Sequence, residues 1–297
     1  MRQLVRAACL AILPLTMTPS LHAAEFTAKD LAAEESKFAA YSVKNGMRAA
    51  FLEFFADSSW LLRPEPVDAR KLISGRPDPA IVLDWKSQLT ILSASGDLGF
   101  STGPTIVRAK ADPKEPASHG QFFSVWQKQK NGAWKVYVDH GISHGPTATP
   151  DALPATPLVA LDLKAQPPVA DARRGEAEQQ FITRSANSNV ASAYADAITA
   201  RTRLLRVDQF PIDGTAAIGA YLASQAGRWS WTPLMQGASR ANDFAYAVGN
   251  YTWQPGEGAA RKGQYVRVWM RDASGASAAR WTLAAEVLTP EPPPRKK

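Results

Sequence analysis

The fold is decided by a seven-residue stretch that occurs twice. Residues 120–126 read Gly-Gln-Phe-Phe-Ser-Val-Trp, and residues 263–269 read Gly-Gln-Tyr-Val-Arg-Val-Trp, 143 positions later. Alternate residues of a strand point to opposite faces, and both faces of these two stretches carry large side chains. We therefore predict two strands buried on both sides, with one face toward helices and a pocket and the other toward a second sheet.

Further markers recur around this stretch in the same order, at offsets of 143 to 147 positions. They are Phe38, Leu61, Leu62, Arg63, Trp85, Asp97, Gly103, Trp134 and Asp139, which return as Phe181, Leu204, Leu205, Arg206, Trp231, Asp243, Gly249, Trp281 and Glu286. Self-similarity over such a period predicts two diverged copies of one domain in tandem.

The repeat divides the chain of 297 residues into five predicted parts. They are a signal peptide over 1–24, a first domain over 25–145, a Pro/Ala-rich linker over 146–170, a second, diverged domain over 171–289 and a disordered Pro-rich, basic tail over 290–297. Proline favours an extended, semi-rigid linker. It also excludes helix and ladder from the tail.

Within the first domain, helical spacing comes before strand patterns. We expect helices over 28–42, 47–55 and 69–74, and strands over 59–63, 81–92, 99–109, 120–128 and 133–140. Asn131-Gly132 is a strong hairpin signal between the last two strands. Helices followed by an antiparallel meander indicate an α+β layer fold.

The first residues have the features of a secretory signal. Arg2 and Arg6 precede and flank an apolar run over 7–15, and the segment ends in the small residues Ala23 and Ala24. This predicts cleavage after Ala23 or Ala24 and export to a bacterial periplasm or secretion from a bacterium. No later stretch is long and apolar enough to span a membrane.

Composition excludes several classes of function. Cys9 is the only cysteine and lies in the signal, so the mature chain has no disulfide and no cysteine nucleophile or metal ligand. The net charge of +7 includes two signal arginines and the basic tail, and no basic stripe with interleaved aromatic residues occurs, so nucleic acid is not an expected partner. No nucleophile elbow or phosphate-binding loop occurs, and we expect no cofactor and no metal.

Short motifs through the first domain occur at residues 33–38, 54–57, 62–64, 95–99 and 131–136. They resemble the nuclear transport factor 2-like superfamily, which includes ketosteroid isomerase and SnoaL-like proteins, and within it the bacterial domains of unknown function of the 4440 type. The resemblance covers most of the first copy and, more faintly, the second. It implies cone-shaped domains, each a curved antiparallel sheet wrapped on N-terminal helices, packed together as an intrachain pseudo-dimer. We expect a monomer or a weak dimer.

The resemblance does not extend to the catalytic residues of ketosteroid isomerase. The family's base is an Asp that precedes a proline after the first strand, and here that position resembles Arg63 in the first copy and Arg206 in the second. The family's first-helix Tyr falls near Phe38 and Phe181. A guanidinium group cannot accept a proton at neutral pH, so isomerase chemistry of this kind is not expected.

An arginine at the pocket mouth of both copies has two interpretations. Arg63 and Arg206 either clamp a carboxylate or another anion, or form internal ion pairs with acids such as Asp139 and Glu286. We favour the ion pair, because a residue shared by two diverged copies fits an architectural role.

Three histidines, His119, His140 and His144, lie in the first copy. Asp139 and His140, with His144, suit a general-base pair or part of a metal site. The segment after His140 has the pattern of a glycine-rich loop, however, so we favour solvated loop histidines.

The leading hypothesis is a non-enzymatic protein that binds a small apolar or anionic molecule in the pocket of the first domain. The ligand-binding candidates are Arg63, Trp60, Tyr137, Asp139 and His140. The first alternative is a hydrolase or lyase that uses Asp139 and His140, the only catalytic candidates, in the same pocket. The second is a protein-interaction module in which side chains fill both cones.

Overall fold

The computed structural model describes residues 25–62, 65–112, 114–164, 175–272 and 280–292. The predicted signal peptide, Arg63 and most of the predicted tail lie outside the described residues. We refer to residues 25–162 as the first half and to residues 175–292 as the second half.

Each half begins with helices and continues with strands. The helices are α1 (Ala28–Asn45), α2 (Met47–Phe54), α3 (Ala69–Ser74), α4 (Glu176–Asn187), α5 (Val190–Ala197) and α6 (Gly214–Ala223). The strands of the first half are β1 (Phe55–Leu62), β2 (Pro66–Asp68), β3 (Ile81–Trp85), β4 (Leu89–Leu92), β5 (Leu98–Ala109), β6 (Ser118–Lys128), β7 (Trp134–His144) and β8 (Val159–Asp162). Those of the second half are β9 (Arg203–Arg206), β10 (Ile212–Asp213), β11 (Arg228–Ala238), β12 (Phe244–Gln254), β13 (Arg261–Asp272) and β14 (Arg280–Pro290).

The strands form two separate sheets, which confirms the α+β class with one sheet in each half. The first sheet has the order β2-β1-β7-β6-β5-β4-β8, with β3 beside β5, and the second has the order β10-β9-β14-β13-β12-β11. We predicted antiparallel sheets, but both sheets also contain parallel pairs of strands. β1 runs parallel to β7, β4 to β8 and β9 to β14.

Two differences from the predicted boundaries concern Pro-rich segments. β8 lies inside the predicted linker and pairs with β4, so the linker contains a strand of the first sheet. Pro290, at the start of the predicted tail, still pairs with Gly263 as the last residue of β14. Proline lacks an N–H group, but it is tolerated at the end of a strand where that donor is not needed.

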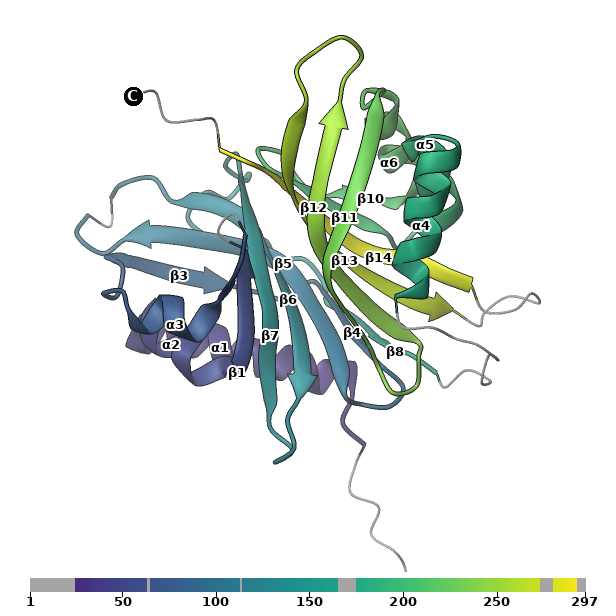
Figure 1. The fold of residues 1–297 in the computed structure, drawn as a ribbon. Coiled ribbons are helices and arrows are strands. Elements are labelled where there is room, and N and C mark those ends of the chain that lie inside the picture. The colour runs from purple at the N-terminus through teal and green to yellow at the C-terminus, as the bar shows by residue number, and fades with distance from the viewer. Residues whose placement is uncertain (1–24, 63–64, 113, 165–174, 273–279, 293–297) are drawn as a thin grey trace, which may run out of the picture.

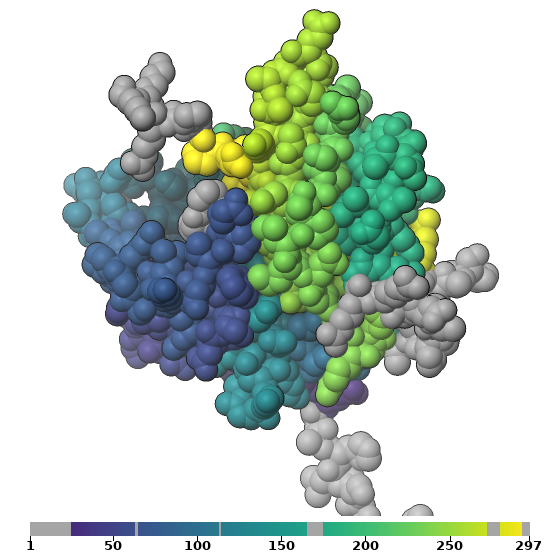
Figure 2. All heavy atoms as spheres, viewed as in Figure 1, coloured from purple at the N-terminus to yellow at the C-terminus, as the bar shows by residue number. Residues whose placement is uncertain are grey.

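The two sheets pack face to face, and helices cover the outer face of each (Figure 1). The halves lie against each other in the space-filling view (Figure 2). Residues of both sheets share one apolar cluster, among them Phe100, Phe123, Val125, Phe244, Val266 and Val268. The alternate residues of β6 and β13 pack toward the helices instead: Phe122 and Trp126 with α1 and α2, and Tyr265 and Trp269 with α4 and α5. The prediction of two faces of burial for both repeated strands is confirmed.

The start and end of α1 follow from its sequence. Thr27 caps the helix, and its side chain and that of Asp30 form a reciprocal capping box. Gly46, with a φ of 91°, ends α1 and starts α2, in a conformation that glycine adopts without steric cost. This turn orients α1 and α2 so that their apolar faces share one cluster against the first sheet.

Two of the repeated markers, Gly103 and Gly249, occupy matching irregularities of the sheets. A Cβ atom on Gly103 would lie 2.0 Å from the carbonyl oxygen of Lys86, opposite the break between β3 and β4. One on Gly249 would lie 2.5 Å from the carbonyl oxygen of Thr232, beside the register shift of β11. Close approach of another backbone explains why both positions are glycine.

The turns at residues 93–97 and 239–243 make reciprocal contacts between the halves. Asp243 accepts a hydrogen bond of 2.7 Å from the Ala94 N–H group, and Asp97 accepts one of 3.1 Å from the Arg240 N–H group. Ala94 and Arg240 are 146 positions apart, as are Asp97 and Asp243. The same type of contact made in both directions is the pattern of a two-fold interface, here within a single chain.

Replacing Asp243 by alanine should destabilise the fold more than replacing Asp97. Asp243 is fully buried and also accepts a 2.6 Å bond from the Ser239 hydroxyl, so its loss leaves a buried hydroxyl and the half-buried Ala94 N–H group without this acceptor, at a cost of about 1–3 kcal/mol. Asp97 is partly exposed, and water can replace it there. Urea denaturation of the two variants tests this expectation, which equal losses of unfolding free energy would contradict.

Candidate functional site

A cavity of about 170 Å³ lies between the helices and the sheet of the first half. Six elements line it: α1 with Glu35 and Phe38, α2 with Met47 and Phe51, β3 with Leu83 and Trp85, β5 with Thr105, β6 with Phe122 and Ser124, and β7 with Asp139. The cavity is therefore mainly aromatic and apolar, with two carboxyl groups in its wall.

Glu35 is a buried acid on the apolar face of α1. It follows Leu31 and precedes Phe38 at helical spacing, and its side chain is 1% exposed. The indole N–H group of Trp85 donates to Oε1 and that of Trp126 donates to Oε2, both at 2.7 Å. Both oxygens thus have a donor, which is how a polar group is accommodated in a core.

The environment of Glu35 favours its protonated form. Burial raises the pKa of Glu35 to about 8, outweighing the two indole donors, which lower it, and the charge of Asp139 raises it further. At neutral pH the carboxyl group therefore holds a proton for most of the time. Desolvation together with a charged neighbour in a cavity is a combination typical of functional sites.

Asp139 lies on β7 directly opposite Ser124 of β6. The Ser124 hydroxyl donates a hydrogen bond of 2.8 Å to Asp139 Oδ1. Both residues line the cavity, so the two carboxyl groups of Glu35 and Asp139 face one space. Among the ligand-binding candidates, Asp139 lines this cavity with a side-chain contact to Ser124.

The other candidates are placed differently. His140 also lines the cavity, but its Nε2 is 2.5 Å from the Thr289 hydroxyl of the second sheet, whereas Asp139 accepts its hydrogen bond from Ser124. Tyr137 packs against the cluster between the sheets, with its ring 5.9 Å from that of Tyr246. Trp60 is not among the residues that line the cavity. Arg63 lies outside the described residues.

The histidines are not loop residues, as the glycine-rich pattern suggested. His119, His140 and His144 are all buried, because β7 continues through Gly141 to His144. His144 Nδ1 donates to the Gly145 carbonyl group at 2.7 Å, and its Nε2 lies 3.2 Å from the Gln121 amide nitrogen. These contacts fix the ring at the edge of the sheet interface.

The second half contains a buried arginine where the first half has a serine. Arg267 lies opposite Glu286 in the pairing of β13 with β14, as Ser124 lies opposite Asp139. Arg267 donates to Glu178 at 2.6 Å and to Glu286 at 2.5 Å, and it is fully buried. The space between helices and sheet is thus occupied by a charged side chain and its partners.

Glu286 is the centre of this buried network. It also accepts bonds from Arg206 and from the Tyr194 hydroxyl, the latter at 2.6 and 2.8 Å. Burial opposes the charged form, but Arg267 and Arg206 outweigh it and hold the pKa of Glu286 below its usual range. The internal ion pair predicted for Arg206 with Glu286 is therefore confirmed.

The internal repeat could have pointed to the buried acids, which the sequence analysis did not select. Glu35 recurs as Glu178, 143 positions later, on the same helix face as Phe38 and Phe181. A carboxylate that recurs on an apolar face indicates a buried polar role. The exchange of Ser124 for Arg267 inside the repeated heptapeptide marks where the two halves differ.

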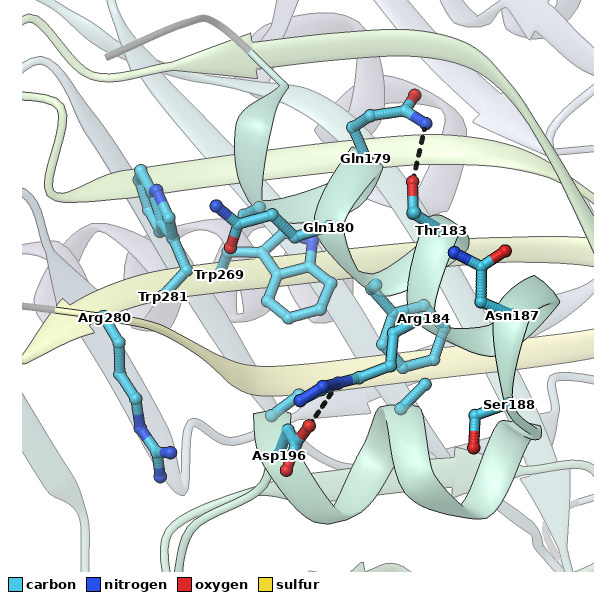
Figure 3. A pocket seen from close by; sticks show the side chains of 14 residues that line it. Gln179, Gln180, Thr183, Arg184, Asn187, Ser188, Asp196, Trp269, Arg280 and Trp281 are labelled. Atoms are coloured by element: carbon cyan, nitrogen blue, oxygen red, sulfur yellow. Dashed lines mark hydrogen bonds and ion pairs between the residues drawn. The ribbon is translucent and has the colours of Figure 1, made fainter. Parts of the chain in front are cut away.

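A larger groove of about 730 Å³ lies over α4 and α5 of the second half, beside Trp269 and Trp281 (Figure 3). Two pairs of its polar side chains contact each other, Arg184 with Asp196 and Gln179 with Thr183, the latter at 3.2 Å. In the described part of the chain, no helix is long and apolar enough to cross a membrane, and no group of three or more His, Cys, Asp or Glu residues is placed to hold a metal.

No family model and no curated protein matches the chain. Solved structures do match. An NTF-2 like protein of unknown function from Shewanella oneidensis MR-1 is 12% identical over 38% of this chain and 93% of its own, with a TM-score of 0.31. A ketosteroid isomerase-like protein from Erwinia carotovora atroseptica SCRI1043 is 13% identical over 39% and 92%, with a TM-score of 0.33. A Mycobacterium tuberculosis protein in complex with estradiol-17β-hemisuccinate is 14% identical over 38% and 88%, with a TM-score of 0.31.

The first two carry the name of the superfamily that the sequence motifs resemble. The 4440-type branch and the descent of the halves from two copies stay predictions. The matches concern the fold, and the chemistry of the site follows from the contacts given above.

Protonation of Glu35 should make the stability of the protein depend on pH. Its pKa rises from 4.5 to about 8 on folding, so its contribution is fully present below about pH 4.5 and is lost as the pH rises to about 8. Relative to Glu35→Gln, the wild type should lose unfolding free energy between pH 5 and 8, by at most about 1.4 kcal/mol per pH unit. Urea denaturation across this range measures the difference. Parallel curves for the two proteins would show that Glu35 does not titrate there.

Removing Arg267 should be far more costly than removing an exposed arginine. Arg267→Ala leaves Glu178 and Glu286 buried without their shared cation, which should cost about 3–5 kcal/mol. Arg184→Ala breaks a pair whose side chains are about half exposed and should cost at most about 1 kcal/mol. Thermal and urea unfolding compare the two variants, and similar losses would mean that the buried network is not a main source of stability.

Proposed function

We propose that this protein is an exported small-molecule-binding protein, with its binding site in the cavity of the first half and the second half as its structural partner. The observation that carries the proposal is the exchange of Ser124 for Arg267. The first half keeps a cavity beside Glu35 and Asp139, whereas Arg267 fills the matching space of the second half. Export to a periplasm or to the medium is supported by the signal pattern of residues 1–24.

The size of the cavity limits the ligand. Pockets for drug-sized ligands have volumes of about 300–1,000 Å³, and this cavity holds about 170 Å³. The ligand is therefore a very small molecule, or a larger one that inserts a single group. Half-buried Met47, Leu83 and Thr105 form the side from which it enters.

Binding accounts for the site better than catalysis does. Asp139 and His140 point to different sides of β7, which separates the two residues that a base pair would need together. An interaction module with filled cones would need both spaces closed, and the cavity of the first half argues against it.

Filling the cavity should abolish binding without unfolding the protein. Ser124→Arg places a guanidinium group between Glu35 and Asp139, as Arg267 lies between Glu178 and Glu286. In a thermal-shift screen of small carboxylates, aromatics, lipids, organic cations and divalent metals, a ligand at a hundred times its Kd should stabilise the wild type by about 2.7 kcal/mol and leave Ser124→Arg unchanged.

The matched control is Ser230→Arg, which adds the same side chain at an exposed position of β11. It should keep the ligand response of the wild type. Ligand responses that persist in a folded Ser124→Arg protein would place the binding site elsewhere.

A further inference from the structure

The second half contains a guanidinium group bound by the chain itself. Two carboxylates, Glu178 and Glu286, accept hydrogen bonds from Arg267. Three aromatic rings surround its Cζ atom, those of Phe181, Trp231 and Tyr265, with centroids at 4.1, 3.9 and 4.4 Å. Ring faces attract cations and carboxylates neutralise them, so this cage has the groups that hold a guanidinium group.

The first half has residues of the same kind at the matching positions. Phe38, Trp85 and Phe122 correspond to Phe181, Trp231 and Tyr265, and Glu35 and Asp139 correspond to Glu178 and Glu286. All five line the cavity of the first half. The guanidinium group of Arg267 has no counterpart in the first half, because the matching residue there is Ser124.

The balance of charge points the same way. In the second half, Arg206 and Arg267 neutralise Glu286 and Glu178. In the first half, the sequence provides a single corresponding arginine, Arg63. Asp139 is half-buried, whereas Glu35 is buried and its described hydrogen-bond donors are neutral indoles, so Glu35 is neutralised by a proton or by a cation that comes from outside the chain.

From this arrangement we infer that the cavity of the first half binds a small organic cation, a guanidinium or alkylammonium group, between Glu35, Asp139 and the surrounding rings. The inference rests on the proposed function, since it names the class of ligand for the same cavity. The cation takes the place of the proton on Glu35, and that proton leaves to solvent.

The other titratable groups around the cavity do not oppose this. Among its described lining residues, His140 is the only one whose side chain can carry a positive charge, and its Nε2 lies at the Thr289 hydroxyl. The hydroxyl group of Ser124 and the faces of Phe38 and Trp85 complete the wall. An anion in this space would meet two carboxyl groups, which disfavours the anionic ligand that was one of the expectations from the sequence.

Isothermal titration of the purified protein with methylguanidine and with methylurea tests the inference, because the two probes share a shape and differ in charge. At constant ionic strength and pH 7.5, methylguanidine should bind, with release of up to one proton detected by repeating the titration in a second buffer. Methylurea should bind at least about tenfold more weakly, as should methylguanidine to Glu35→Gln, since a hydrogen bond to a charged group is lost in each case. Ser124→Arg should not bind.

Other outcomes separate the class of ligand from the site. Suppose that a neutral or anionic compound binds the wild type and Glu35→Gln but not Ser124→Arg. This result would overturn the inference that the ligand is a cation, and it would leave the cavity as the binding site. Binding lost in Arg63→Ala and kept in Glu35→Gln would overturn it in favour of an anion. Binding of no probe or screened compound to the wild type would overturn both the inference and the proposed function.

Arg267→Ser provides a positive control, because it opens the cage of the second half. Methylguanidine should raise the Tm of this variant by restoring the lost cation. Rescue of Arg267→Ser without any binding to the wild type would show that the probe is adequate and would overturn the inference. If Arg267→Ser does not fold, the comparison of the wild type with Glu35→Gln and Ser124→Arg decides alone.

Discussion

Two carboxyl groups lie on the helix-facing side of each sheet, and Glu35, Glu178 and Glu286 are buried there, so each of these three must be neutralised. An ionised carboxylate without partners is far too costly in such a place, so it is paired or it takes up a proton. The second half uses pairing, with Arg267 between Glu178 and Glu286 and Arg206 on the other side of Glu286. The first half gives Glu35 two indole donors and a proton instead. Pairing with arginine fills the space between helices and sheet in the second half. Protonation of Glu35 needs no such side chain, and the first half keeps a cavity there.

The packing of the sheets against each other determines on which side such spaces can exist. One face of β6 and of β13 is covered by the opposite sheet, where Phe123, Val125, Val266 and Val268 fill the interface. Only the helix-facing side can then contain a cavity in either half. The same packing contributes to the burial of the histidines of β7, because His140 Nε2 contacts the Thr289 hydroxyl of the second sheet.

Much of this arrangement could be predicted from the sequence, because it depends on local periodicity or on the repeat. The spacing of apolar residues predicted α1 and α2, and alternation in the repeated heptapeptide predicted burial of both its faces. The recurrence of Arg206 predicted its ion pair with Glu286. The parallel pairing of β8 with β4 could not be predicted, since its partner is distant in sequence and its flanks are rich in proline. Glu35 was missed for a related reason: the indole donors that make its burial possible come from two distant strands, and only the fold brings them together.

The difference between the halves also explains how one chain can contain a site that disfavours its own charged group. A buried acid with a raised pKa lowers stability at neutral pH, as polar groups at functional sites often do. In the filled cage of the second half, by contrast, the buried acids are paired with arginines. These arginines lower the pKa of Glu286 and so favour its ionised form. The two halves share one apolar interface and reciprocal bonds between their turns, so the stability of the second half supports the first. Ser124 in one strand and Arg267 in the other thus distinguish the half that keeps a cavity from the half whose matching space is filled, which is the difference that the proposed function uses.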